Sequence, residues 1–211
     1  DEAAEQGESL PLEETGPVEA PIDFVCTADP PEEPFDVVAW AFRTHGESEM
    51  VREMLQTAYL RLAPGGRFAA AIDNPEDQWL HGELKKLYPK VTRRPSKRGV
   101  TYLTIRPDAP IKIKQHAAEF AFRDRGRLIA AFSRPGVFSH RQIDPGARAL
   151  INTMELPPNA NVLDLGCGSG TVALAALCRS EKIRVLGIDS NPRALQCAER
   201  GATANGLTGL T

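Results

Sequence analysis

Three glycines at alternate positions, preceded by an acidic residue, form the part of the sequence best suited to binding a ligand. They are Gly166, Gly168 and Gly170, and Asp164 precedes them at the end of an apolar strand. Glycine permits positive φ and leaves no side chain between the backbone and a ligand. The run Thr171–Cys178 is expected to be a helix whose N-terminal N–H groups point at the turn. The pattern predicts a strand–turn–helix unit that binds a nucleotide-like cofactor.

A second acidic residue, Asp189, ends the next predicted strand, Ile183–Ile188, 19 residues after Gly170. An acid at this place is suited to accept hydrogen bonds from ribose hydroxyls. A dinucleotide-binding turn has the spacing Gly-x-Gly-x-x-Gly, whereas here the third glycine comes one residue early, so NAD is a poorer fit. A tight corner in an α/β domain without a ligand is the structural alternative; it explains the glycines but not both acids.

The pattern Asp-x-Gly-x-Gly-x-Gly, followed by a second strand that ends in an acid, resembles motifs I and II of the class I S-adenosylmethionine (SAM)-dependent methyltransferases. The resemblance implies that the glycine turn lies along the methionine and ribose of SAM. It also implies that Asp164 lies near the amino group and Asp189 at the ribose hydroxyls. The implied cofactor-binding residues are Asp164, Gly166, Cys167, Gly168, Gly170, Asp189 and Ser190.

The first half of the chain resembles the second half of such a methyltransferase domain. The expected elements are strands at Ile22–Val25, Phe35–Trp40, Arg67–Ile72 and Val100–Ile105, and helices at Glu47–Leu62 and Glu76–Leu87. Amino-methylating members end their fourth strand in Asn-Pro-Pro-Phe or Asp-Pro-Pro-Tyr. This chain has Ala39, Trp40, Ala41 and Phe42 there, so the resemblance implies a degenerate domain without chemistry, with Trp40 and Phe42 in its core.

Between the two halves, alternating apolar residues on either side of Asp124–Gly126 predict a β-hairpin, with arms at Ile111–Phe122 and Leu128–Phe132. The stretch that follows, residues 134–146, is called the RPG segment below. Its residues Arg134–Ser139 and Asp144–Gly146 resemble the matching segment of two-domain ribosomal RNA guanine methyltransferases, the small-subunit type C and large-subunit type G enzymes.

This narrower resemblance implies methyl transfer from SAM to the exocyclic amine of a guanine in ribosomal RNA, with ribosomal RNA or a ribosomal subunit as partner. The RPG segment would close over SAM. Within it, His140 is expected to be a surface-loop residue. The neighbouring Arg134, Arg141 and Arg148 could contact RNA phosphates or simply be solvated. No catalytic residue can be assigned, because the Asn-Pro-Pro motif of the second domain is not in this sequence.

The expected fold class is α/β, with Rossmann-like class I methyltransferase sheets in tandem: a degenerate N-terminal half-domain and the front half of a SAM-binding domain. We expect an acidic, disordered tail over residues 1–21, the degenerate domain over 22–107, a linker hairpin over 108–133 and the SAM-binding domain over 134–211. The chain looks like a fragment with exposed sheet edges. A circularly permuted domain, in which both halves complete one sheet, is the alternative.

Composition excludes several classes of protein. With 42% hydrophobic and 25% charged residues the chain is typical of globular proteins, and no apolar run is long enough to span a membrane. Its four cysteines have no metal-ligand spacing, which favours reduced thiols, no metal site and a cytoplasmic protein. The oligomeric state is not determined by these patterns.

Charge is divided unevenly along the chain. Residues 1–42 carry 12 acidic residues and no lysine or arginine, which leaves 25 basic and 16 acidic residues in the remainder. The basic residues are densest between Lys85 and Arg98. Such a run suits a phosphate backbone, although a solvated face is also possible. A methyltransferase of a small molecule or protein, and a non-catalytic module that binds RNA or a partner, therefore stay open as alternatives.

Overall fold

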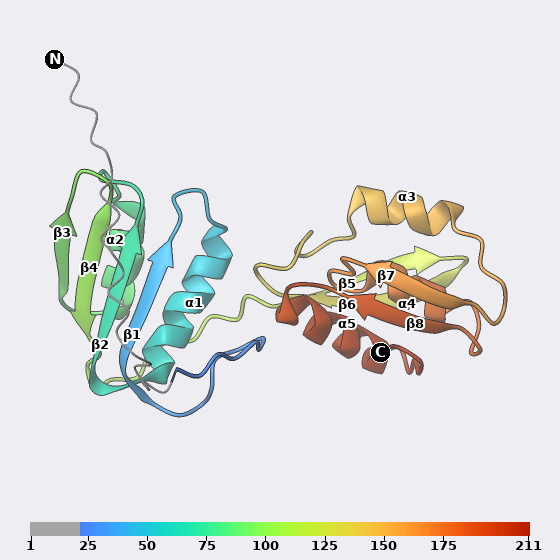
Figure 1. The fold of residues 1–211 in the computed structure, drawn as a ribbon, viewed down its shortest axis with the longest axis horizontal. Helices are drawn as coiled ribbons and strands as arrows, with labels where there is room; N and C mark the ends of the chain where they lie inside the picture. The colour runs from blue at the N-terminus through green and yellow to red at the C-terminus, as the bar shows by residue number, and fades with distance from the viewer. Residues whose placement is uncertain (1–21) are drawn as a thin grey trace, which may run out of the picture.

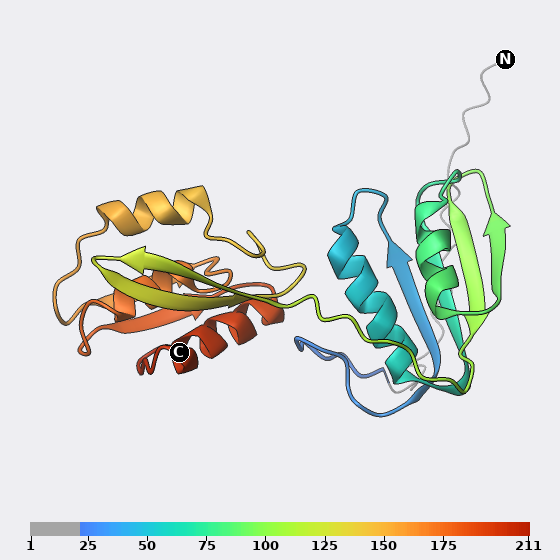
Figure 2. The same cartoon turned by 180° about the vertical axis from the view of Figure 1, so that it is seen from behind.

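The computed structural model describes residues 22–211, which form two lobes joined by an extended segment (Figure 1). Residues 35–105 make the first lobe, and residues 118–211 make the second. Seen from behind, the connection at residues 106–117 runs from the first lobe directly into the hairpin of the second (Figure 2). The predicted acidic tail at residues 1–21 lies outside the described residues.

The first lobe is a four-stranded mixed sheet with two helices. Its strands have the order β1-β2-β4-β3, with β1 parallel to β2 and the other pairs antiparallel. The elements are β1 (Phe35–Phe42), α1 (Ser48–Arg61), β2 (Leu62–Ile72), α2 (Trp79–Leu87), β3 (Val91–Pro95) and β4 (Val100–Ile105). Helices α1 and α2 contribute Leu55, Tyr59 and Leu84 to one buried cluster with Phe68 and Tyr102 of the sheet.

The edge strand β1 is mostly exposed, because it has a neighbouring strand on only one side. Phe42 is buried as predicted, but Trp40 is 36% exposed and stacks on Phe42. The prediction of a core position is therefore wrong for Trp40.

The predicted hairpin is present at the start of the second lobe and consists of β5 (Ala118–Asp124) and β6 (Arg127–Ser133). Residues 111–117 of its predicted first arm form no strand. Arg125 and Gly126 at its tip both have positive φ, which is the conformation of the two-residue turns that match strand twist. The side chain of Asn205 donates to the carbonyl of Ala130 and accepts from its N–H, so it fastens the hairpin to the end of α5.

The rest of the second lobe alternates helices and parallel strands. The elements are α3 (Pro145–Thr153), β7 (Asn161–Leu165), α4 (Thr171–Leu177), β8 (Arg184–Ile188) and α5 (Pro192–Ala204). Strand β7 is parallel to β8. Leu210 also forms an isolated parallel bridge with Val185 of β8. Ile129, Ile151 and Leu174 belong to the cluster that packs the hairpin against the helices.

Most predicted elements are present, but some predictions are wrong. Residues Ile22–Val25 form no strand, and Phe24 is 91% exposed. Strand β3 was not predicted, and β2 begins at Leu62 instead of after the glycines. The two lobes have separate sheets, so the single completed sheet of a circular permutation is also wrong for the described residues.

Candidate functional site

The glycine turn after β7 has the backbone that its sequence predicts. Gly166, Gly168 and Gly170 have φ values of 71°, 54° and 78°, all in the left-handed region. The N–H groups of Gly166 and Cys167 both donate to the carbonyl of Ile188 at the end of β8. The turn is therefore fixed to the tip of the neighbouring strand.

The three glycines have different roles. A Cβ added to Gly170 would lie 2.6 Å from the Cβ of Ala198 on α5, so glycine is needed there for helix packing. A Cβ added to Gly166 or Gly168 would meet nothing within 4 Å. Open space beside these two residues leaves their backbone accessible to a ligand.

Asp189 at the end of β8 points at the glycine turn. Its Oδ2 accepts a hydrogen bond of 2.9 Å from the N–H of Gly168, and its Oδ1 accepts one of 2.8 Å from Asn191. Each carboxylate oxygen keeps a free lone pair that can accept another donor. Ser190 beside it is exposed.

The other predicted acid, Asp164 in β7, contacts the first turn of α4. Its Oδ2 accepts a hydrogen bond of 3.2 Å from the N–H of Ala173 in α4. Burial raises the pKa of Asp164, and the nearby charge of Asp189 adds to the shift. Two carboxylates in a half-buried site favour a cationic ligand, because a positive charge would offset their mutual repulsion.

Cys167 is a buried structural residue of the turn. Burial raises the pKa of its thiol to about 11, so the thiol is neutral near pH 7. A neutral buried thiol is a poor nucleophile. Its sulfur packs beside Gly187, where an added Cβ would lie 3.3 Å away.

A cavity of about 220 Å³ lies between the glycine turn and the RPG segment. The turn side contributes Asp164, Gly166, Cys167 and Gly168, four of the seven predicted site residues; Gly170, Asp189 and Ser190 do not line it. The opposite wall includes Phe138, Ser139 and Gln142 of the RPG segment together with residues of α3. Phe138 is 74% exposed, so its ring is available to contact a ligand.

His140, predicted to be a surface-loop residue, and the neighbouring arginines, which could contact RNA phosphates or be solvated, already have partners within the fold. The Nδ1 of His140 lies 2.8 Å from the Oγ of the buried Ser133. Arg134 pairs with Asp29 and Glu53, and Arg141 pairs with Glu49. The guanidinium of Arg148 donates to the carbonyl of Arg123 and lies over the ring of Phe122. These arginines support the fold.

Two residues at the start of α5 that were not predicted hold the RPG segment beside the turn. Asn191 donates to the carbonyl of Gly136 at 2.7 Å, and Arg193 donates to the carbonyl of Pro135 at 3.2 Å. The Asn-Pro pair at 191–192 is a sequence signal for the start of a helix. It does not reveal these long-range contacts.

Residues 129–211 match the family model described as the methyltransferase small domain. The chain is 32% identical over 99 residues to the uncharacterized protein YbxB of Bacillus subtilis, which covers 46% of this chain and 49% of that protein. It is 39% identical over 75 residues to ribosomal RNA small subunit methyltransferase C of Klebsiella pneumoniae, covering 36% of this chain and 22% of that enzyme.

Among solved structures, the 16S rRNA N2 G1207 methyltransferase of Thermus thermophilus, in complex with AdoMet and guanosine, shares the fold with a TM-score of 0.74. The sequences are 23% identical, and the match covers 84% of this chain and 50% of that chain. This chain therefore spans about half the length, or less, of these proteins.

Within residues 22–211, no helix is long and apolar enough to cross a bilayer. The family match and the structural match point to the same class of protein. Residues 129–211 match the model of the methyltransferase small domain, and the chain has the Rossmann-like α/β fold of the class I methyltransferases.

Proposed function

We propose that the glycine turn and Asp189 bind SAM, and that the chain is part of a methyltransferase acting on the exocyclic amine of a guanine in ribosomal RNA. The observation that carries the cofactor proposal is the position of the Asp189 carboxylate. Its Oδ2 lies 2.9 Å from the backbone nitrogen of Gly168. The space beside Gly166 and Gly168 is empty, since a Cβ added to either residue would meet no atom within 4 Å. An acid in this position can accept both hydroxyls of a ribose.

The residues present fit the charges of SAM. Asp164, whose raised pKa reports an unfavourable negative charge, can receive the ammonium of the methionine part. The open backbone of Gly166 and Gly168 lets the cofactor approach without a steric conflict. Phe138 can cover it from the other wall of the cavity and exclude water. SAM supplies an electrophilic methyl group on sulfur, so the protein contributes chiefly by holding the reacting groups in line.

The substrate proposal is supported by the relatives and by surface charge. The enzymes of Klebsiella and Thermus act on ribosomal RNA by their descriptions. In the first lobe, the stretch from α2 to the turn after β3 carries the exposed residues Lys85, Lys90, Arg94, Lys97 and Arg98. Phosphate contacts by such residues make RNA affinity fall steeply as salt rises, which would separate RNA from a small-molecule substrate. An activity on ribosomal RNA would place the protein in the cytoplasm.

Replacing Asp189 by asparagine tests the cofactor proposal. Asparagine keeps the size of the side chain, but it removes the charge and can accept only one of the two backbone hydrogen bonds. We expect SAM affinity to fall about 30-fold, which corresponds to about 2 kcal/mol for hydrogen bonds to a charged group. Isothermal titration calorimetry of SAM into the 211-residue chain measures this change.

The matched control is Glu199→Gln, which neutralises an exposed carboxylate on α5, the helix that follows Asp189. It should bind SAM like the unaltered chain. Equal affinity of the Asp189→Asn and Glu199→Gln variants would exclude Asp189 as a cofactor ligand.

A further inference from the structure

The cavity beside the glycine turn is lined only by residues between 138 and 172, all of the second lobe. The RPG segment that forms its outer wall is nevertheless held in place by α1 of the first lobe. Glu49 and Glu53 of α1, and Glu47 directly before it, each form a hydrogen bond or ion pair with this segment. The first lobe therefore contacts the segment that forms the cavity wall, although none of the residues that line the cavity belongs to the first lobe.

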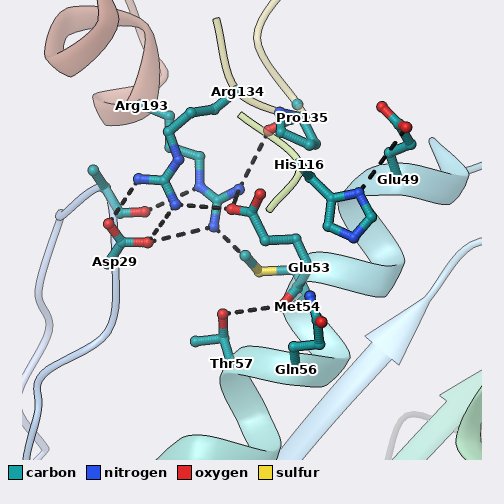
Figure 3. A network of polar contacts seen from close by, with 12 residues as sticks. Asp29, Glu49, Glu53, Met54, Gln56, Thr57, His116, Arg134, Pro135 and Arg193 are labelled. Atoms are coloured by element: carbon teal, nitrogen blue, oxygen red, sulfur yellow. Dashed lines mark hydrogen bonds and ion pairs between the residues drawn. The ribbon is translucent and has the colours of Figure 1, made fainter. Parts of the chain in front are cut away.

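Glu53 holds the beginning of the segment (Figure 3). Its Oε1 lies 2.8 Å from Nη2 of Arg134 and 2.9 Å from Nη1 of Arg193. Asp29 is a second carboxylate partner of Arg134, with its Oδ2 2.7 Å from Nη1 of that arginine. Arg193 is nearly buried and also binds the carbonyl of Pro135, so the carboxylate of Glu53 offsets the cost of burying its charge.

Glu49 holds the middle of the segment, one turn earlier on α1. Its carboxylate accepts hydrogen bonds from Nε and Nη2 of Arg141. The Nε2 of His140 lies 3.4 Å away, and the Nδ1 of His116, a residue only 2% exposed, lies 4.0 Å away. Hydrogen bonding to Arg141 lowers the pKa of Glu49, which keeps the carboxylate charged.

The backbone between these contacts is strained. Ser139 and Arg141 have φ values of 54° and 74°, which side-chain-bearing residues rarely adopt. Such conformations persist where surrounding contacts determine them, and they cluster around ligand sites. Phe138, the exposed ring of the cavity wall, directly precedes this strained pair. The contacts of Glu49 with Arg141 and His140 are therefore placed to fix where Phe138 lies.

We propose that Glu49 and Glu53 of α1 are positioning residues for the cofactor cavity, because they hold the RPG segment over the glycine turn. This inference rests on the proposed binding of SAM. It gives the first lobe, whose sequence lacks the catalytic motif, a part in setting cofactor affinity. A purely structural role of the same contacts would stabilise the fold without changing the affinity for SAM.

Glu49→Gln tests this role in the 211-residue chain. We expect hydrogen exchange of the amides of residues 134–142 to rise, and SAM affinity to fall about 5-fold, the low end of coupling between separate sites. Glu83→Gln is the matched control, because Glu83 also forms ion pairs from the first lobe, with Arg52 and Lys86, but does not contact the segment. It should change neither quantity, even if it lowers the melting temperature.

A double-mutant cycle of SAM affinity separates a specific interaction between Glu49 and Arg141 from general destabilisation. If Glu49 acts through Arg141, the double variant Glu49→Gln/Arg141→Gln should bind SAM no more weakly than either single variant. The conservative variant Arg141→Lys keeps the charge but loses the forked geometry, and it replaces Glu49→Gln if that variant does not fold.

Unchanged exchange of residues 134–142 in Glu49→Gln would overturn the proposal, as would increased exchange with unchanged SAM affinity. If the unaltered chain bound no SAM, the proposed function would fail. The exchange measurement, made without SAM, would still decide whether α1 holds the segment.

Discussion

Replacing Gly170 by alanine is expected to lower the free energy of unfolding by about 3 kcal/mol or more. Two physical effects add. The φ of 78° costs a residue with a side chain about 1–3 kcal/mol, and overpacking costs a similar amount. The new Cβ would lie 2.6 Å from the Cβ and 3.0 Å from the Cα of Ala198, so α5 would have to move away from the turn. Chemical denaturation followed by circular dichroism measures the loss.

Gly168→Ala is the control for this prediction, because Gly168 also has positive φ but an added Cβ there meets nothing within 4 Å. It should show only the conformational cost, about 1–2 kcal/mol. Similar losses in the two variants would mean that close packing against α5 is not what Gly170 provides.

Replacing Asp124 by alanine is expected to cost about 3–5 kcal/mol of stability, because it leaves a buried guanidinium without its counter-charge. Arg179 contacts Asp124 through two nitrogens, at 3.0 and 3.2 Å, and both side chains are less than one-tenth exposed. Arg179 also binds the carbonyls of Ile151 and Met154, so this pair joins the hairpin to the end of α3. Thermal and chemical denaturation report the change.

The exposed pair of Glu119 and Arg200 supplies the comparison. Its nitrogen–oxygen distance is 2.8 Å, but both side chains are more than half exposed. Glu119→Ala should therefore change stability by no more than about 1 kcal/mol. If Asp124→Ala lowered stability as little as Glu119→Ala, burial of the pair between Asp124 and Arg179 would not increase its contribution to stability.

The parts of the candidate site that sequence could predict are those formed by local contacts. The glycines need positive φ, and Asp189 reaches Gly168 across only 21 residues of chain. The residue types and spacing of the glycines and Asp189 were therefore sufficient to predict the shape of the turn and the position of the acid. Ser190 remains a prediction, since it is exposed beside Asp189 and outside the cavity lining.

Sequence could not predict the hold of α1 on the RPG segment. The contacts of Glu53 with Arg134 and of Glu49 with Arg141 join residues 81 and 92 positions apart. Helical periodicity gives the apolar face of α1, but its charged face has no pattern that names a partner. For the same reason the sequence left open whether Arg134 and Arg141 contact RNA phosphates or are solvated. It also predicted a surface-loop position for His140, whose ring instead contacts Ser133 and Glu49.

Errors in the predicted fold have similar causes. Ile22–Val25 has the composition of a strand but pairs with no neighbouring strand, so it forms no strand and stays exposed. Val91–Pro95 is basic and polar, and it becomes strand β3 because β4 offers it an edge. In both cases pairing overrides the local preference.

The most direct test of the central claim is hydrogen exchange of the 211-residue chain with and without saturating SAM. The account predicts a saturable effect, with protection concentrated at the backbone amides of residues 166–170 and 189–191. Absence of SAM-dependent protection at these amides, or protection confined to the first lobe, would contradict it.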